Sequence, residues 1–142
     1  DRRAALEGSD FAAFRTLADM PWAMTAHVLY TAIDPDRPAT TSRKVIRDVI
    51  RGYIGFKGVL VSDDLSMQAL DGDLADRARK SLEAGCDIVL HCTGKLDEMQ
   101  AIAPALAPLT AEAARRIAAA KARCAPSPGA SSPCSAGSFP GR

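Results

Sequence analysis

The chain has 142 residues, enough for one domain or part of one, and its formal net charge is +1 with 25% charged and 47% hydrophobic residues. This near-neutral balance argues against a nucleic-acid partner, which usually requires a basic patch, because arginines and lysines here alternate with acids. No apolar run approaches the roughly 18 residues of a membrane span, so no membrane partner is expected.

The first residues, DRRAALEGSD, contain neither an initiator Met nor the apolar core of a signal peptide. They open in mid-pattern, so we expect a longer protein with sequence upstream of Asp1. The four cysteines form no Cys-x-x-Cys pair and are too sparse for a disulfide framework, which favours a reducing cytoplasm. Cys86 and Cys92 flank an apolar run, where buried thiols are expected rather than metal ligands, and no cofactor is expected.

The first part of the chain predicts a helix, a strand and a second helix. Apolar residues recur at helical spacing between Ser9 and Ala18, with Ser9 as the candidate cap. The apolar run WAMTAH is expected to form a strand that ends at His27. After a turn-rich connector, SRKVIRDVIRGYIG places four branched residues on one helical stripe, with Thr41 or Ser42 as the N-cap.

The remainder alternates in the same way. Gly58–Ser62 is expected to form a strand, followed by the helix DLADRARKSLEAG with Asp73 as its N-cap and Gly85 as its C-cap. The run CDIVLHC predicts a third strand, and two helices follow, the last of them capped by Thr110. Residues 125–142 are rich in Pro, Ser and Gly and predict a disordered tail.

Continuous apolar strands separated by amphipathic helices predict an α/β fold with a parallel sheet covered by helices. Each expected strand ends in a titratable residue, namely His27, Asp63 and His91. Active sites of α/β enzymes, and of (β/α)8 barrels in particular, lie at the carboxyl ends of parallel strands. Three polar strand ends in succession therefore indicate a candidate active site.

Two adjacent aspartates end the strand in GVLVSDDLSM. Because side chains alternate along a strand, Asp63 shares the inward face of Val59 and Val61, whereas Asp64 points to the other face. Burying a carboxylate costs free energy unless it is paired or hydrogen-bonded, so a chemical role is expected for Asp63. Asp64 is expected to organise the following turn.

The stretches MTAHV, KVIRDVIRGYIGFKGVLVSDDLSM and ARKSLEAGCDIVLHC resemble bacterial β-N-acetylhexosaminidases of glycoside hydrolase family three, over roughly residues 5–119. The resemblance implies a TIM-like (β/α)8 barrel, of which residues 1–124 supply about the last three βα units. It also implies retaining hydrolysis of terminal β-linked N-acetylglucosamine from muropeptides during peptidoglycan recycling.

The same resemblance assigns site residues. The family's nucleophile is the aspartate directly after the Ser or Thr of the strand-end motif, which here is Asp63, so a covalent glycosyl-enzyme on Asp63 is implied. His27, Met67 and His91 are candidates for binding substrate because of their positions at or near strand ends, not because of the family motif, and each has a structural role as the alternative. The family's acid/base histidine lies in a K-H-x-P-G-H-G loop that this sequence lacks, so the chain alone is expected to be inactive.

Two alternatives remain open. The chain could be a non-catalytic α/β fragment whose open sheet edges favour association. It could instead be a phospho-acceptor regulatory module, since such domains also place aspartates at strand ends. That module would need a separate acidic pair, a lysine at another strand end and Mg²⁺, and the sequence offers no matching lysine or later acceptor.

Overall fold

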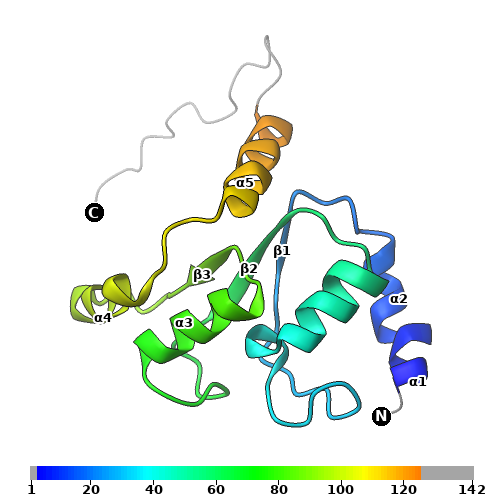
Figure 1. Cartoon of the computed structure of the whole chain (residues 1–142), viewed down its shortest axis with the longest axis horizontal. Helices are drawn as coiled ribbons and strands as arrows, with labels where there is room; N and C mark the ends of the chain where they lie inside the picture. Colours follow the sequence, from blue (N-terminus) through cyan, green and yellow to red (C-terminus); the bar gives the residue numbers. More distant parts are fainter. Residues whose placement is uncertain (1–2, 126–142) are drawn as a thin grey trace, which may run out of the picture.

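The computed structural model describes residues 3–125, which form an α/β fold on a three-stranded parallel sheet (Figure 1). The strands are β1 (Trp22–Met24), β2 (Val59–Asp64) and β3 (Ile88–Leu90). Their order is β1-β2-β3, so β2 is central and the other two are edge strands within the described residues. The predicted parallel sheet is confirmed. The predicted disordered tail lies outside the described residues, except for its first residue.

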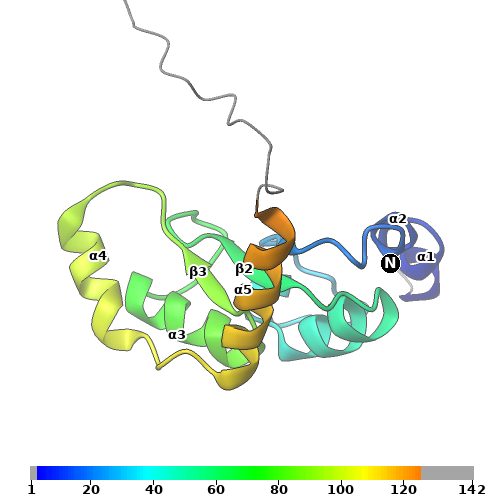
Figure 2. The same cartoon turned by 90° about the horizontal axis from the view of Figure 1, so that it is seen from above.

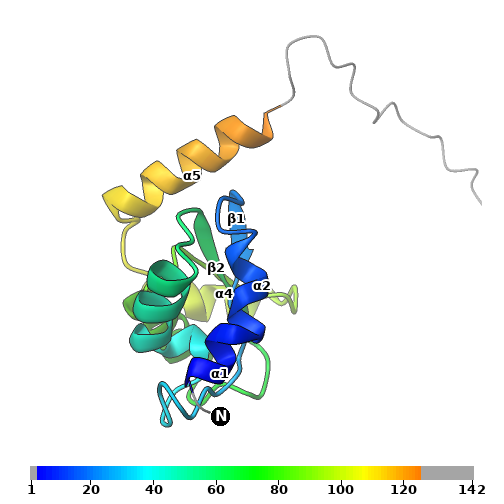
Figure 3. The ribbon, with the colours of Figure 1, turned by 90° about the vertical axis from the view of Figure 1, so that its right-hand side faces the viewer.

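Helices precede and connect the strands. In chain order they are α1 (Arg3–Gly8), α2 (Asp10–Arg15), the short 3-10 turn η1 (Ala39–Thr41), the π-helix η2 (Val45–Tyr53), α3 (Leu74–Ala84), α4 (Leu96–Ile102), the 3-10 turn η3 (Ala103–Ala105) and α5 (Ala111–Cys124). Figures 1 and 2 show η2 and α3 beside the sheet, while Figure 3 shows α5 across the end where the strands begin. None of these described helices is long and apolar enough to span a membrane.

The two faces of the sheet differ in how they are covered. On one face Leu60 of β2 packs with Ile46 of η2 and Ala84 of α3 in a buried cluster. On the other face, at the β1 edge, Trp22 and Met24 are 39% and 55% exposed. Parallel sheets are normally covered on both faces, so the described residues leave an unusual apolar surface open.

A second buried cluster joins the first helices to η2. Leu6 of α1 and Phe11 of α2 pack with Val49 of η2, and the rings of Phe11 and Tyr30 meet edge to face with centroids 5.2 Å apart. The hydroxyl of Tyr53 donates to the carbonyl of Glu7. These contacts hold α1 and α2 against η2, one of the helices that cover the sheet.

The prediction of a single helix between Ser9 and Ala18, capped by Ser9, is wrong in its bounds and in its cap. The helix α2 ends at Arg15, and a separate helix, α1, precedes it. Ser9 does not cap α2, because its hydroxyl donates to the carbonyl of Ala5 in the preceding helix, 2.8 Å away.

The predicted ends of the later helices are confirmed. Asp73 and Thr110 cap α3 and α5, each accepting the backbone N–H three residues further along. Gly85 ends α3 with a φ of 122°, an angle that side-chain-bearing residues rarely adopt. Of the two caps considered for the middle helix, Ser42 is used and Thr41 is not, since the Ser42 hydroxyl oxygen accepts the N–H of Val45 at 3.1 Å.

A buried ion cluster lies where the strands begin. Asp87, directly before β3, accepts from the guanidinium groups of Arg51 in η2 at 2.9 Å and Arg116 in α5 at 2.8 Å. It also accepts the N–H of Leu60 at 2.9 Å. One carboxylate thus connects η2, β2 and α5 through charge-assisted hydrogen bonds, which are roughly twice as strong as neutral ones.

The two cysteines that flank β3 have different environments. Cys86 is buried, and burial raises the pKa of its thiol to about 12. Cys92 is exposed in the loop after β3. The prediction of a buried thiol is therefore confirmed for Cys86 and wrong for Cys92.

We expect alkylation at pH 8 to modify Cys92 long before Cys86 in the folded chain. With a pKa of about 12, only about one Cys86 thiol in 10⁴ is ionised at that pH, and the thiolate is the reactive form. Timed alkylation followed by peptide mass mapping measures both rates. In denaturant the two rates should converge, whereas similar rates in the folded chain would contradict the burial of Cys86.

Candidate active site

The carboxyl ends of the strands lie opposite α5 (Figure 1). The predicted ends of two strands differ by one residue from those observed: β2 ends at Asp64 rather than Asp63, and β3 ends at Leu90 rather than His91. The strand predicted to end at His27 is shorter, because β1 ends at Met24. His27 therefore lies beyond the strand, where the chain no longer pairs with β2.

An irregularity in the sheet shapes the end of β2. Residues 61–64 of β2 span the same stretch of sheet as residues 88–90 of β3, so β2 carries one extra residue. The buried Ser62 bridges this gap: its hydroxyl oxygen accepts the N–H of Leu90 at 2.9 Å and its hydroxyl donates to the carbonyl of Asp63 at 2.8 Å. Such bulges re-aim neighbouring side chains, here the two aspartates.

Asp63 is half-buried at the end of the central strand. Its Oδ1 accepts the backbone N–H of Asp64 at 2.8 Å, and its own N–H donates to Thr25 Oγ1 at 3.3 Å. Among residues 3–125, this one backbone N–H is the hydrogen-bond donor to the Asp63 carboxylate. The second carboxylate oxygen accepts no hydrogen bond from these residues.

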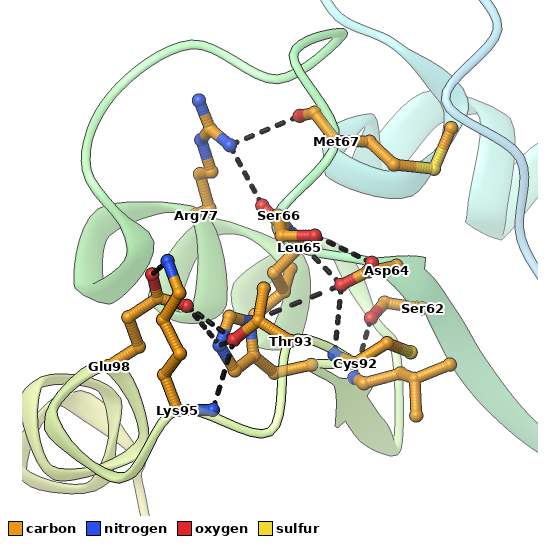
Figure 4. A network of polar contacts seen from close by, with 12 residues as sticks. Ser62, Asp64, Leu65, Ser66, Met67, Arg77, Cys92, Thr93, Lys95 and Glu98 are labelled. Atoms are coloured by element: carbon orange, nitrogen blue, oxygen red, sulfur yellow. Dashed lines mark hydrogen bonds and ion pairs between the residues drawn. The ribbon is translucent and has the colours of Figure 1, made fainter.

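The Asp64 carboxylate holds the turn that follows β2 (Figure 4). It accepts the hydroxyl of Ser66 at 2.6 Å, the N–H of Ser66 at 3.0 Å and the N–H of Cys92 at 3.1 Å. The Ser66 hydroxyl first, and then these backbone donors, hold the pKa of Asp64 below its ordinary value. The predicted turn-organising role of Asp64 is confirmed.

His27 is bonded within the fold through both ring nitrogens. Its Nε2 lies 2.9 Å from the carbonyl oxygen of Asp64, and because a carbonyl only accepts, Nε2 carries a hydrogen. Its Nδ1 lies 2.8 Å from the hydroxyl of the buried Thr40, which in turn contacts the hydroxyl of Thr25 at 2.8 Å. His27 thus supports the turn after β2, and its substrate-binding role stays a prediction.

His91 connects β3 to α4. Its Nε2 lies 2.8 Å from Glu98 Oε2 and 2.8 Å from the hydroxyl of Thr93. Its Nδ1 is buried, has no hydrogen-bond partner among the described residues and lies 4.0 Å from Asp64 Oδ1. The Thr93 hydroxyl and then Lys95 lower the pKa of Glu98. His91 thus lies beside the Asp64 carboxylate without a hydrogen bond to it, and its contact with substrate also stays a prediction.

Met67 lies in the loop after β2 with its side chain 44% exposed. Arg77 of α3 fixes this loop, donating to the carbonyls of Leu65 at 2.8 Å, Met67 at 3.1 Å and Gly72 at 2.9 Å. Figure 4 shows the Met67 side chain directed away from Arg77. A role of Met67 against substrate remains a prediction.

Sequence reasoning missed Arg77 and Thr40 as supports of the site. Arg77 is one of several arginines and lysines on α3, and nothing in its spacing sets it apart from those that face solvent. Thr40 lies in a turn-rich connector that gave no sign of burial. Within residues 3–125, no group of three or more His, Cys, Asp or Glu side chains is arranged to hold a metal ion.

This parallel sheet carries two carboxylates at the carboxyl end of its central strand, which is where α/β enzymes build their active sites. The chain belongs to glycosyl hydrolase family 3, because residues 2–125 match the family's N-terminal domain. The family resemblance found in the sequence is thereby confirmed.

Two curated relatives are bacterial β-hexosaminidases. The protein of Alkalilimnicola ehrlichii is 53% identical over 94 residues, which is 63% of this chain and 27% of that protein. The protein of Nitrosomonas eutropha is 44% identical over 91 residues, covering 61% of this chain and 26% of its own length. The chain thus spans about a quarter of the curated relatives it matches.

Solved structures show the same similarity. A family 3 β-N-acetylglucosaminidase from Paenibacillus sp. str. FPU-7 superposes with a TM-score of 0.77 at 30% identity, covering 94% of this chain and 29% of that one. NagZ from Neisseria gonorrhoeae in complex with N-trifluoroacetyl-D-glucosamine gives a TM-score of 0.73 at 37% identity, covering 84% of this chain and 34% of that one.

Proposed function

We propose that residues 3–125 form the nucleophile-bearing part of an enzyme that removes terminal β-linked N-acetylglucosamine with retention of configuration. The observation that carries this proposal is the position of Asp63 at the carboxyl end of the central strand, with one oxygen held by a backbone N–H and the other available. The β-hexosaminidase relatives and the sugar-bound NagZ neighbour support the choice of sugar.

In the proposed reaction a carboxylate oxygen of Asp63 attacks the anomeric carbon while the bond to the leaving-group oxygen breaks. That oxygen takes a proton from a general acid, and a glycosyl ester on Asp63 remains. Water then attacks the same carbon, gives its proton to the conjugate base and breaks the ester, which restores the carboxylate. Two displacements at one carbon give overall retention.

The general acid is proposed to come from outside residues 3–125. His27 uses both ring nitrogens for bonds within the fold, and His91 directs Nε2 to Glu98. General acid–base catalysis commonly contributes about 10²–10⁴-fold, so the chain without such a group should turn over poorly. We therefore infer that the active enzyme is longer than this chain, and we call it the full-length enzyme below.

The proposed enzyme is a TIM-like (β/α)8 barrel in which residues 1–124 supply about the last three βα units. Three parallel strands in sequential order agree with that arrangement. The exposed side chains of Trp22 and Met24 also agree with it, since the same face would point into a closed barrel. The free edges of β1 and β3 would then pair with further strands.

The proposed natural substrate is an N-acetylglucosamine-containing muropeptide, cleaved in the cytoplasm during peptidoglycan recycling. The family resemblance supports the substrate. The free thiols of Cys86, Cys92 and Cys124 support a reducing compartment.

A fluorinated N-acetylglucosaminide with a good leaving group should label Asp63 in the full-length enzyme. Fluorine slows both the formation and the hydrolysis of the glycosyl-enzyme, because it destabilises their electron-poor transition states. The good leaving group restores the rate of formation alone, so the glycosyl-enzyme accumulates. Peptide mass mapping locates the added sugar. Labelling of Asp64, or no covalent adduct despite complete inactivation, would contradict the assignment.

A further inference from the structure

Every polar group of Asp64 is engaged by the protein. The carboxylate accepts three hydrogen bonds from Ser66 and Cys92. The carbonyl accepts the Nε2–H of His27 at 2.9 Å and the N–H of Met67 at 3.2 Å. The backbone N–H donates to Asp63 Oδ1 at 2.8 Å. Asp64 thereby connects the segments that follow β1, β2 and β3.

We propose that Asp64 is a positioning residue for Asp63. Its carboxylate fixes the turn after β2, and this fixes the direction of its own backbone N–H, which holds Asp63 Oδ1. The inference rests on the proposed role of Asp63 as nucleophile. It assigns to the second aspartate of the pair a part in the same reaction without contact with the sugar.

The geometry explains why the carboxylate is needed for this orientation. The Asp64 N–H lies in the peptide plane between the two aspartates, so its direction follows the backbone angles on either side. On the Asp64 side they are constrained by the bond from the Ser66 N–H to the carboxylate and by the bond from His27 Nε2–H to the Asp64 carbonyl. On the Asp63 side, the Ser62 hydroxyl donates to the carbonyl of the same peptide. The bond from Cys92 N–H anchors the same carboxylate to the end of β3.

Removing the carboxylate would leave the N–H groups of Ser66 and Cys92 without their acceptor and release the turn. Asp63 Oδ1 would then lose its fixed donor, and the carboxylate could rotate away from the line of attack. A misplacement of about 1 Å can cost about 10²-fold in rate. Because Asp64 does not touch the sugar in this proposal, the loss should fall on kcat rather than on KM.

Asparagine at position 64 separates positioning from charge. Its amide oxygen can accept the two N–H groups that both bond to Oδ1, and its NH₂ can donate to the Ser66 hydroxyl oxygen, which accepts as readily as it donates. Asp64→Asn therefore keeps the hydrogen bonds of the turn and removes the negative charge. Asp64→Ala removes the hydrogen bonds as well as the charge.

The test compares kcat and KM of the full-length enzyme on a chromogenic N-acetylglucosaminide. We expect Asp64→Ala to lower kcat by roughly 10- to 100-fold with KM changed less than about threefold, and Asp64→Asn to stay within about threefold of the wild-type kcat. Asp71→Ala, which removes an exposed carboxylate of the same loop, is the matched control and should have no effect. Hydrogen exchange of the backbone N–H at position 64 should be faster in the Asp64→Ala variant than in the Asp64→Asn variant.

The outcomes separate this inference from the proposed function. Full activity of Asp64→Ala, together with an inactive Asp63→Ala enzyme, overturns the positioning role alone. An Asp64→Asn enzyme as impaired as Asp64→Ala also overturns it, because charge rather than geometry would then matter. Full activity of Asp63→Ala would instead remove the nucleophile assignment itself. If Asp64→Ala does not fold, Ser66→Ala tests the same turn, and an unchanged kcat in that variant would count against the inference.

Discussion

Replacement of Asp63 with alanine should lower kcat/KM of the full-length enzyme on a nitrophenyl N-acetylglucosaminide by at least about 10⁴-fold, since loss of a nucleophile is among the costliest changes in an active site. In the proposed mechanism, the glycosyl-enzyme cannot form without this carboxylate. Steady-state kinetics with a folded variant measures the loss. Asp97→Ala, an exposed carboxylate change on α4, should retain the wild-type rate.

Added azide should partly restore turnover of the Asp63→Ala enzyme. The truncated side chain leaves room for a small anion on the face from which Asp63 would attack, and one displacement by azide inverts the anomeric centre. The expected product is therefore the α-glycosyl azide, which proton NMR distinguishes from the β-anomer. A β-configured azide product, or rescue of Asp64→Ala but not of Asp63→Ala, would argue against Asp63 as nucleophile.

In the 142-residue chain, replacement of Asp87 with alanine should lower the free energy of unfolding by about 3–5 kcal/mol, the range for removing one partner of a buried ion pair. The change leaves the guanidinium groups of Arg51 and Arg116 without their shared anion, and the Arg51 side chain is only 18% exposed. It also deprives the Leu60 N–H of its acceptor. Urea unfolding followed by the fluorescence of Trp22, the single tryptophan, measures the loss.

Two further variants test the cause of this destabilisation. Asp76→Ala removes a partly exposed carboxylate that pairs with Arg79 and Lys80 on the surface of α3, and stability should change little. A triple variant with Asp87→Leu, Arg51→Met and Arg116→Met should recover most of the lost stability, because a buried ionic group replaced as a whole leaves no unpaired charge. An Asp87→Ala protein as stable as the wild type would show that the cluster contributes nothing.

Features that depend on local chemistry could be predicted from the sequence. Asp73, Thr110 and Gly85 mark helix ends because a capping side chain or a left-handed glycine acts within three residues of its own position. Strand alternation also predicted different surroundings for Asp63 and Asp64, and the two carboxylates do have different partners, although the bulge at residues 61–64 interrupts the regular alternation. For the three helix ends the relevant partners lie close by in the chain.

Features that depend on distant partners could not be predicted. Asp87 is one acid at the start of an apolar run, and its arginines lie 36 residues before it and 29 residues after it. His27 bonds to the carbonyl of Asp64, 37 residues later, only because β1 ends early and the chain leaves the sheet. The π-helical winding of η2 was also missed, since its stripe of branched residues is equally typical of an ordinary α-helix.

The two ends of the bulged strand β2 make different contacts. Its amino end is held by Asp87 at Leu60, while Asp63 lies three residues further on, at most about 10 Å away because the bulge shortens the rise of an ordinary strand. Free-energy changes at sites this far apart without shared partners are usually additive. In the proposed enzyme, loops at the carboxyl end can therefore change to accept other leaving groups while the contacts at the opposite end keep the chain folded. Substitutions that stabilise the contacts of α5 should therefore make the chain more tolerant of sequence changes in those loops, and the turn after β2 would not need to be altered first.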